Sequence, residues 1–221
     1  MIKACVFDAY GTLFDVHSAV ARHGAAPAVS ELWRIKQLEY SWVRTLARRH
    51  ADFWQCTQDA LDYALATHAI TQPGLRDGLL QSYRTLDVYP DVRPALGTLR
   101  DLGQKTAVLS NGTPNMLAEA VAAGGLGDML DHVLSVEAVG CFKPAPAAYA
   151  LATRALGVSA HEILFLSSNA WDAMGAQAFG MTVCWVNRTA RPPEYGTMPV
   201  IRSLAEINIS ERQASATTPG S

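Results

Sequence analysis

The chain has 221 residues, and its 18 lysine and arginine residues nearly balance its 20 aspartate and glutamate residues, for a formal net charge of -2. At roughly 150 residues per domain, this length allows one large domain or two small ones. So low a charge excludes strong electrostatic attraction to nucleic acid or anionic lipid, and no apolar run approaches the ~18 residues of a membrane span. We therefore expect a globular protein with a small-molecule partner, no nucleic acid and no membrane.

The start of the chain predicts a cytoplasmic protein. Lys3 precedes a short apolar run, but Asp8 comes too early for the core of a signal peptide. The cysteines form no C-x-x-C pair and have no histidine at metal-ligand spacing, so they indicate neither a zinc site nor a disulfide framework. We expect reduced, mostly buried thiols at Cys5, Cys56, Cys141 and Cys184.

Short apolar runs that end in polar residues predict the strands of a parallel sheet. These runs cover residues 3–7, 105–109, 163–166 and 183–186. Helical patterns that end before a glycine lie beside the later runs, at residues 94–102, 116–123, 147–156 and 171–179. The alternation predicts an α/β fold with a Rossmann-like parallel sheet core flanked by helices.

Residues 15–89 interrupt this alternation, because they contain helical patterns and no convincing strand. One helical face is predicted from the spacing of Leu32, Ile35, Leu38, Trp42 and Leu46. A second is predicted from Ala60, Leu61, Ala64 and Leu65. We therefore predict an α/β core of residues 1–14 and 90–209, an inserted helical cap like a four-helix bundle at residues 15–89, and a disordered tail at residues 210–221.

Polar residues gather where the predicted strands end. They are Asp8, Thr12, Ser110, Asn111, Ser167 and Asn169. Ligands of open α/β sheets bind at the carboxyl ends of the strands, so these side chains should converge on one site. A carboxylate directly after a buried strand is well placed for a nucleophile. From spacing alone, the alternative that Asp8 only caps a turn stays open.

Four segments of the chain resemble, in the expected order, the four motifs of the haloacid dehalogenase superfamily: residues 7–15, 109–112, 143–144 and 165–172. Two further segments, residues 32–40 and 52–54, resemble the helical cap of the L-2-haloacid dehalogenases. The resemblance implies a hydrolase of carbon-halide bonds that converts short L-2-haloalkanoic acids to D-2-hydroxyalkanoic acids and halide. It implies no cofactor, and it points to a homodimer.

Two departures from the phosphatases of this superfamily favour the dehalogenase branch. Tyr10 stands where the phosphatases have a second aspartate as general acid, and Ser168 stands where they have an aspartate that helps to hold Mg²⁺. A phosphoryl group without a cation would lose much of its charge neutralisation, whereas a halide needs no proton to leave. We therefore expect no metal.

The resemblance also implies a mechanism. Asp8 would displace the halide and form an aspartyl ester, which a water activated by Asp172 would hydrolyse. Arg34 and Asn111 would stabilise the departing halide, and Lys143 would keep the carboxylates ionised. Purely structural alternatives stay open for three of these residues. Asp172 could be a carboxylate at a helix N-terminus, Arg34 a solvated helix residue, and Lys143 part of a structural salt bridge.

The remaining site residues follow by the same resemblance. Ser110 and the N–H groups after Asp8 would anchor the substrate carboxylate, and Tyr149 would support Lys143 and Asp172. The implied catalytic set is Asp8, Thr12, Arg34, Ser110, Lys143, Tyr149, Ser167, Asn169 and Asp172. The implied substrate-binding set is Ala9, Tyr10, Arg34, Leu38, Phe53, Ser110, Asn111 and Trp171. For Leu38 and Phe53, a place in the core is the equal alternative.

Two positions depart from the dehalogenase pattern: Ile35 replaces a glutamine beside the arginine, and Ala145 replaces an acid after Lys-Pro. These changes bear on the substrate range and on the loop of Lys143. A Mg²⁺-dependent phosphatase of the same superfamily and a catalytically silent binding protein on this fold are the competing functions. Tyr10 and Ser168 argue against the first, and the presence of the whole charged set argues against the second.

Overall fold

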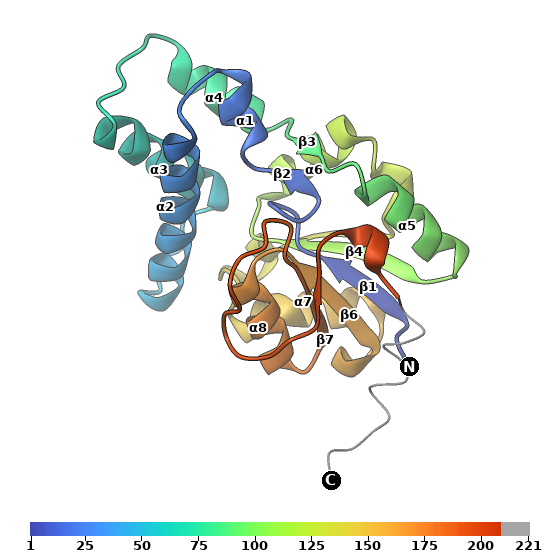
Figure 1. Ribbon diagram of the computed structural model, residues 1–221. Helices are drawn as coiled ribbons and strands as arrows, with labels where there is room; N and C mark the ends of the chain where they lie inside the picture. The colour runs from blue at the N-terminus through green and yellow to red at the C-terminus, as the bar shows by residue number, and fades with distance from the viewer. Residues whose placement is uncertain (209–221) are drawn as a thin grey trace.

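The structure is a computed structural model that describes residues 1–208 (Figure 1). Residues 209–221, which include the predicted tail at 210–221, lie outside the described residues. Figure 1 shows a sheet with helices on its sides and a group of helices, α1 to α4, set apart from it.

The core is a six-stranded sheet in which every neighbouring pair of strands is parallel. Its spatial order is β5 (His132–Ser135), β4 (Lys105–Ser110), β1 (Ala4–Phe7), β6 (Ile163–Ser167), β7 (Thr182–Val186) and β8 (Val200–Ile201). β1 lies in the middle of the sheet, and all four of its residues are buried. This burial on both faces explains why the central strands are continuous apolar runs.

Helices cover both faces of the sheet, and α7 and α8 lie on the side opposite α5 in Figure 1. The helices of the core are α5 (Val92–Asp101), α6 (Pro114–Gly124), α7 (Pro146–Leu156) and α8 (Ala170–Phe179). Short 3₁₀ helices cover Gly127–Met129, Val136–Val139, Ala160–Glu162 and Leu204–Glu206. The predicted α/β fold class is confirmed.

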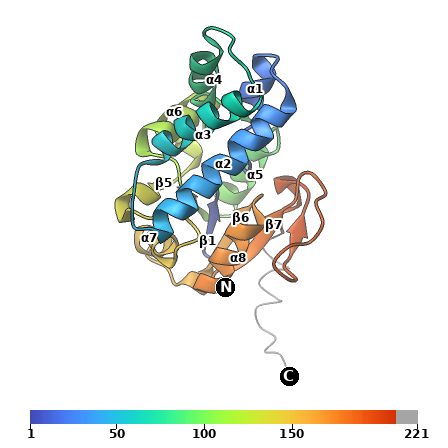
Figure 2. The ribbon, with the colours of Figure 1, turned by 90° about the vertical axis from the view of Figure 1, so that its left-hand side faces the viewer.

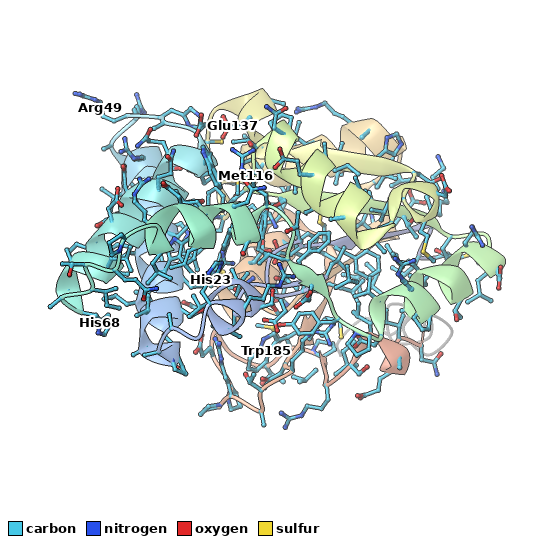
Figure 3. All side chains as sticks on the ribbon, turned by 90° about the horizontal axis from the view of Figure 1, so that it is seen from above. His23, Arg49, His68, Met116, Glu137 and Trp185 are labelled. Carbon is cyan, nitrogen blue, oxygen red and sulfur yellow. The ribbon has the colours of Figure 1, made fainter. Side chains whose placement is uncertain are left out.

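The inserted segment is helical, as expected. It consists of α1 (Ser18–Arg22), α2 (Pro27–Leu46), α3 (Phe53–Thr67) and α4 (Leu75–Tyr83). A two-stranded antiparallel sheet of β2 (Phe14–Asp15) and β3 (Asp87–Val88) pairs the two chain segments that connect it to the core. The longest of these helices is α2, and Figure 2 shows it passing in front of the core. In the view from above, Arg49 and His68 lie at the outer side of the cap (Figure 3).

The prediction of a single apolar face on α2 was wrong in part. Ile35 and Leu46 are 59% and 84% exposed. The face that α2 buries holds Trp33 and also Gln37 and Ser41, which are 1% and 0% exposed. Because these polar side chains make hydrogen bonds inside the cap, hydrophobicity alone does not mark the buried face. The second predicted face is confirmed, because α3 buries Ala60, Leu61, Ala64 and Leu65.

The strands β5 and β8 were not predicted, because both are short and lie at or near the sheet edges, where the apolar signal is weak. Cys5, Cys56 and Cys184 are buried, Cys141 is half-buried, and none forms a disulfide, as expected. In the stretch from residue 1 to residue 208, no helix has the length and apolar character needed to cross a membrane.

Candidate functional site

The site lies at the carboxyl ends of three adjacent strands. β1 lies between β4 and β6, and all three run in the same direction. Asp8 follows β1, Ser110 ends β4, and Ser167 ends β6. The sheet therefore brings to one edge polar residues that lie far apart in the sequence.

The carboxylate of Asp8 is 5% exposed and is held at both oxygens. Its Oδ2 accepts hydrogen bonds from Thr12 Oγ1 at 3.1 Å and from Asn169 Nδ2 at 2.9 Å. Its Oδ1 accepts one from Lys143 Nζ at 3.0 Å. These donors fix the orientation of the carboxylate.

Lys143 also pairs with Asp172, whose Oδ2 lies 2.8 Å from Lys143 Nζ. The lysine is 1% exposed and Asp172 is fully buried. Burial opposes the charge of the ammonium group, but the nearby carboxylates of Asp172 and Asp8 outweigh it and raise the pKa of Lys143. Burial raises the pKa of Asp172 above its ordinary value, although Lys143 opposes this shift. One cation thus holds two buried carboxylates together.

Asp172 lies in the first turn of α8, and two further side chains hold it. The hydroxyl of Tyr149 donates to Oδ1 at 2.7 Å, and the hydroxyl of Ser167 donates to Oδ2 at 3.1 Å. Burial, and then the charge of Asp172, raise the pKa of Tyr149, so this hydroxyl stays protonated and remains a donor. No hydrogen bond joins Tyr149 to Lys143 within residues 1–208, so Tyr149 supports Lys143 only through Asp172.

Ser110 and Asn111 lie on the other side of the nucleophile. Oγ of Ser110 accepts the N–H of Gly112 at 3.1 Å, which leaves its own proton for another acceptor. Oδ1 of Asn111 accepts the backbone N–H of Lys143 at 2.9 Å. Asn111 therefore positions the loop that carries the lysine.

The turn after β1 presents backbone donors. The carbonyl of Ala9 accepts the N–H groups of the residues that follow it, but the N–H groups of Ala9 and Tyr10 themselves find no acceptor in the described part of the chain. Adjacent N–H groups of this kind can bind an anion.

A cleft of about 850 Å³ opens beside these residues, between α2 and the segments that follow β1, β6 and β7. Five of the predicted site residues line it: Tyr10, Arg34, Leu38, Asn169 and Trp171. Ile35, the departure from the dehalogenase pattern, also lines it. The cleft is therefore bounded by the cap on one side and by the catalytic turns on the other.

Arg34 reaches from α2 to the nucleophile turn. Its Nη2 donates to the carbonyl of Tyr10 at 3.2 Å, and its Nη1 donates to Oε1 of Gln37 at 2.7 Å. The guanidinium is thus held at the cleft and is not a solvated surface group.

Phe53 is 1% exposed and is not on the wall of the cleft. Its ring contacts Tyr10 at a centroid distance of 6.2 Å and Phe142 at 5.7 Å. Phe53 therefore packs against Tyr10, which lines the cleft, and does not line the cleft itself. Ala9 is fully buried, so only its backbone is available to a ligand.

Arg188 lines the cleft but was missed from the sequence. It donates to both oxygens of Asp91 at 2.8 and 3.0 Å and to the carbonyl of Thr12 at 2.9 Å, and it lies 4.1 Å from the Tyr89 ring centroid. Arg188 lies two residues after the apolar run 183–186. Polar residues after the other apolar runs were chosen as site candidates, so the same pattern could have identified Arg188. Gln37 was missed because nothing in its spacing distinguishes a buried amide from a solvated one.

The carboxylates of Asp8 and Asp172 are both paired with Lys143, and Ser168, whose hydroxyl contacts Thr12, offers no carboxylate oxygen. Within residues 1–208, no cluster of three or more histidine, cysteine, aspartate or glutamate side chains has a metal-binding arrangement. This donor set does not fit Mg²⁺.

Known proteins that are similar to this chain in sequence and fold are haloacid dehalogenases and related hydrolases. The family model described as haloacid dehalogenase-like hydrolase matches residues 2–180. The chain is 46% identical over 215 residues to (S)-2-haloacid dehalogenase 4A of Burkholderia cepacia, with 93% of each chain covered. It superposes with a TM-score of 0.90 on a crystal structure of a dehalogenase that is 46% identical, with 93% of this chain and 95% of that chain covered.

A second solved structure contains a covalently bound compound. It is the L-2-haloacid dehalogenase from Xanthobacter autotrophicus with chloropropionic acid covalently bound. The TM-score is 0.83 at 39% identity, with 99% of this chain and 100% of that chain covered. By sequence, fold and site, the chain belongs to the haloacid dehalogenase-like hydrolase family.

Proposed function

We propose that this protein is a hydrolytic dehalogenase that converts short L-2-haloalkanoic acids to D-2-hydroxyalkanoic acids and halide. The observation that carries this proposal is the pair of carboxylates, Asp8 and Asp172, held on one lysine, with the guanidinium of Arg34 on the nucleophile turn. The names of the relatives and the covalent chloropropionic acid in one of them support it.

In the first step, a carboxylate oxygen of Asp8 attacks C2 of the substrate from the side opposite the halogen. The new C–O bond forms as the carbon-halogen bond breaks, and the halide leaves with the electron pair. Attack from the opposite side inverts C2. Arg34 and Asn111 stabilise the departing anion, and Tyr10, Leu38 and Trp171 surround the alkyl group and exclude water.

In the second step, water attacks the carbonyl carbon of the aspartyl ester. Asp172 takes a proton from the water, the acyl C–O bond breaks, and the product oxygen receives a proton. Asp8 keeps one oxygen from water, and C2 is not inverted again, so an L substrate gives a D product. The raised pKa of Asp172 makes it a stronger base for this step.

The substrate carboxylate binds at the N–H groups of Ala9 and Tyr10 and at the hydroxyl of Ser110. Thr12, Ser167 and Asn169 hold the carboxylates, and Tyr149 holds Asp172. The donor geometry described above supports each of these roles.

The test is halide release from L- and D-2-chloropropionate in the presence of EDTA, followed by mass spectrometry of the protein after turnover in ¹⁸O-water. We expect release from the L enantiomer only and label on Asp8. Absence of halide from both enantiomers would overturn the proposal. Fluoroacetate belongs in the same assay, because its stronger carbon-halogen bond tests the stabilisation that Arg34 provides.

A Mg²⁺-dependent phosphatase is the second candidate. It is disfavoured because Tyr10 and Ser168 stand where the phosphatases of the superfamily have carboxylates. Mg²⁺-dependent release of phosphate from p-nitrophenyl phosphate would support it. A silent binding protein would be supported if Asp8→Asn left every measured property unchanged.

Three further predictions are part of this proposal, and of these only the homodimer comes from the family resemblance. They are a cytoplasmic location, a homodimer, and a division into a core of residues 1–14 and 90–209 and a cap of residues 15–89. Analytical ultracentrifugation tests the dimer. Limited proteolysis at the 14–15 and 87–90 connections tests the division.

A further inference from the structure

Gln37 is a buried amide on α2, one turn after Arg34, and it is 1% exposed. Its Oε1 accepts hydrogen bonds from Arg34 Nη1 at 2.7 Å and from the Tyr83 hydroxyl at 3.2 Å. Its Nε2 donates to Oγ1 of Thr57 at 2.7 Å. A single side chain thus links the guanidinium at the cleft to α3 and to the end of α4.

The orientation of this amide follows from Thr57. The Thr57 hydroxyl donates its one proton to the carbonyl of Phe53 at 2.7 Å, so it can only accept from Gln37. The NH₂ group of Gln37 must therefore face Thr57, and its carbonyl oxygen must face Arg34. The reverse orientation would place two donors against each other at Arg34 and two acceptors against each other at Thr57.

Tyr83 fixes the same oxygen from a third direction. Burial raises the pKa of Tyr83, so its hydroxyl stays protonated and donates. Its ring is stacked on Tyr10 at a centroid distance of 5.6 Å and contacts Trp33 at 4.9 Å. The aromatic contacts keep the hydroxyl in place, and one of them is with the residue whose carbonyl receives Arg34.

We propose that Gln37 is a positioning residue that aims the guanidinium of Arg34 at the departing halide. This inference rests on the proposed dehalogenase function. The amide holds one nitrogen of the guanidinium from the cap, and the Tyr10 carbonyl holds the other from the core. Because both terminal nitrogens of Arg34 are held, the guanidinium cannot swing freely, and its remaining N–H groups point in fixed directions.

The neutrality of Gln37 matters as much as its position. A carboxylate at the same place would form an ion pair with Arg34 and neutralise the charge that the halide needs. An amide fixes the guanidinium and leaves its full positive charge for the developing anion. The proposal therefore explains why this buried partner of an arginine is an amide.

The test compares leaving groups. The carbon-bromine bond breaks with less help than the carbon-chlorine bond, so a displaced Arg34 should slow chloride release more than bromide release. We expect Gln37→Met to lower the single-turnover rate of halide release from L-2-chloropropionate by about 10–100-fold and the rate from L-2-bromopropionate by less, so that the bromide-to-chloride ratio of these rates rises. Both rates are measured as halide release by the full-length protein in single turnover.

Ser41→Ala is the matched control. Ser41 is a fully buried polar residue on the same helix, but within residues 1–208 its hydroxyl bonds only the carbonyl of Leu38, at 2.7 Å. This variant should retain the wild-type ratio. Thr57→Val, nearly isosteric, removes the acceptor that orients the amide and should shift the ratio in the same direction as Gln37→Met, so it carries the test if Gln37→Met does not fold.

The outcomes separate the two proposals. If the wild-type protein releases no halide from either substrate, the proposed function is overturned and this inference falls with it. If the wild type is active but Gln37→Met and Thr57→Val keep the ratio found for Ser41→Ala, the inference alone is overturned.

Discussion

Tyr149 and Gly175 fit together so closely that a Cβ atom on Gly175 would lie 2.5 Å from the Tyr149 hydroxyl oxygen. It would also lie 2.6 Å from Cβ of Pro144. Gly175 is inside α8, where alanine would otherwise be the better helix former. Its missing side chain is what allows the tyrosine hydroxyl to reach Asp172.

Gly175→Ala should therefore be destabilising and should slow ester hydrolysis. Overpacking of this kind costs about 1–3 kcal/mol. Displacement of Tyr149 removes a hydrogen bond from Asp172, so the aspartyl ester should accumulate. Gly97→Ala is the control, because a Cβ at this position in α5 meets nothing closer than a Met129 atom at 4.0 Å and should add about 0.5–1 kcal/mol. Urea unfolding and mass spectrometry of the protein during turnover measure both effects; equal behaviour of the two variants would contradict the argument.

Lys143→Met should leave two buried carboxylates without their cation. Removing one partner of a buried ion pair costs about 3–5 kcal/mol, and here two carboxylates lose the same partner. We expect a large loss in the free energy of unfolding at neutral pH and loss of halide release. The control is Lys3→Met, which breaks an ion pair with Glu162 at the surface and should change both quantities far less. A Lys143→Met protein as stable as Lys3→Met would show that the lysine does not balance the carboxylates.

The acid limb of the pH profile should report Asp172. Its folded pKa is raised by burial, so it becomes protonated at a higher pH than an ordinary aspartate. Only the ionised form accepts a proton from water, and kcat should therefore fall as the pH drops through this raised pKa. The first displacement does not need this base, so the ester should accumulate on the acid side. Asp128→Asn, at an exposed position, should keep the same limb, and an ester that never accumulates at low pH would count against the assignment.

Stability at acid pH should depend on Asp91. Burial alone would raise its pKa, but hydrogen bonds from Arg188, Ser203 and the N–H of Leu204 lower it below its ordinary value. Because the pKa of Asp91 is lower in the folded than in the unfolded protein, its ionised carboxylate stabilises the fold at pH values above the unfolded pKa. This stabilisation is lost as the pH falls through the folded pKa. Asp91→Asn should cost about 1–3 kcal/mol at neutral pH and flatten the decline toward acid. Urea unfolding across this pH range is the measurement; an unchanged slope would contradict the prediction.

The strand ends were the most predictable part of the molecule. Asp8, Ser110 and Ser167 each follow an apolar run, and the parallel sheet brings such ends to one edge whatever the details of the helices. Buried central strands leave a continuous apolar signal, and glycines mark the ends of the helices between them. This local information is enough for the fold class.

The arrangement of polar side chains inside the cap was not predictable in the same way. Gln37 and Ser41 lie on the buried face of α2, whereas Ile35 faces the cleft, so the hydrophobic pattern misplaces that face. Arg188 pairs with Asp91, 97 positions away in the chain, and no local pattern encodes such a contact. Without the resemblance to a known family, nothing in the sequence distinguishes Arg34 from the other arginines of the chain.

The division of labour between α2 and the sheet also has a consequence for how such an enzyme changes. Arg34, Ile35 and Leu38 reach the cleft from a single helix of the cap, while Asp8, Lys143 and Asp172 belong to the turns after the strands and to the start of α8 in the core. Substitutions at Ile35 and Leu38 can therefore alter which acid is accepted without touching the groups that make and break the ester. A combinatorial library confined to these two positions, with Arg34 kept, would explore new substrates while the reaction itself is inherited unchanged.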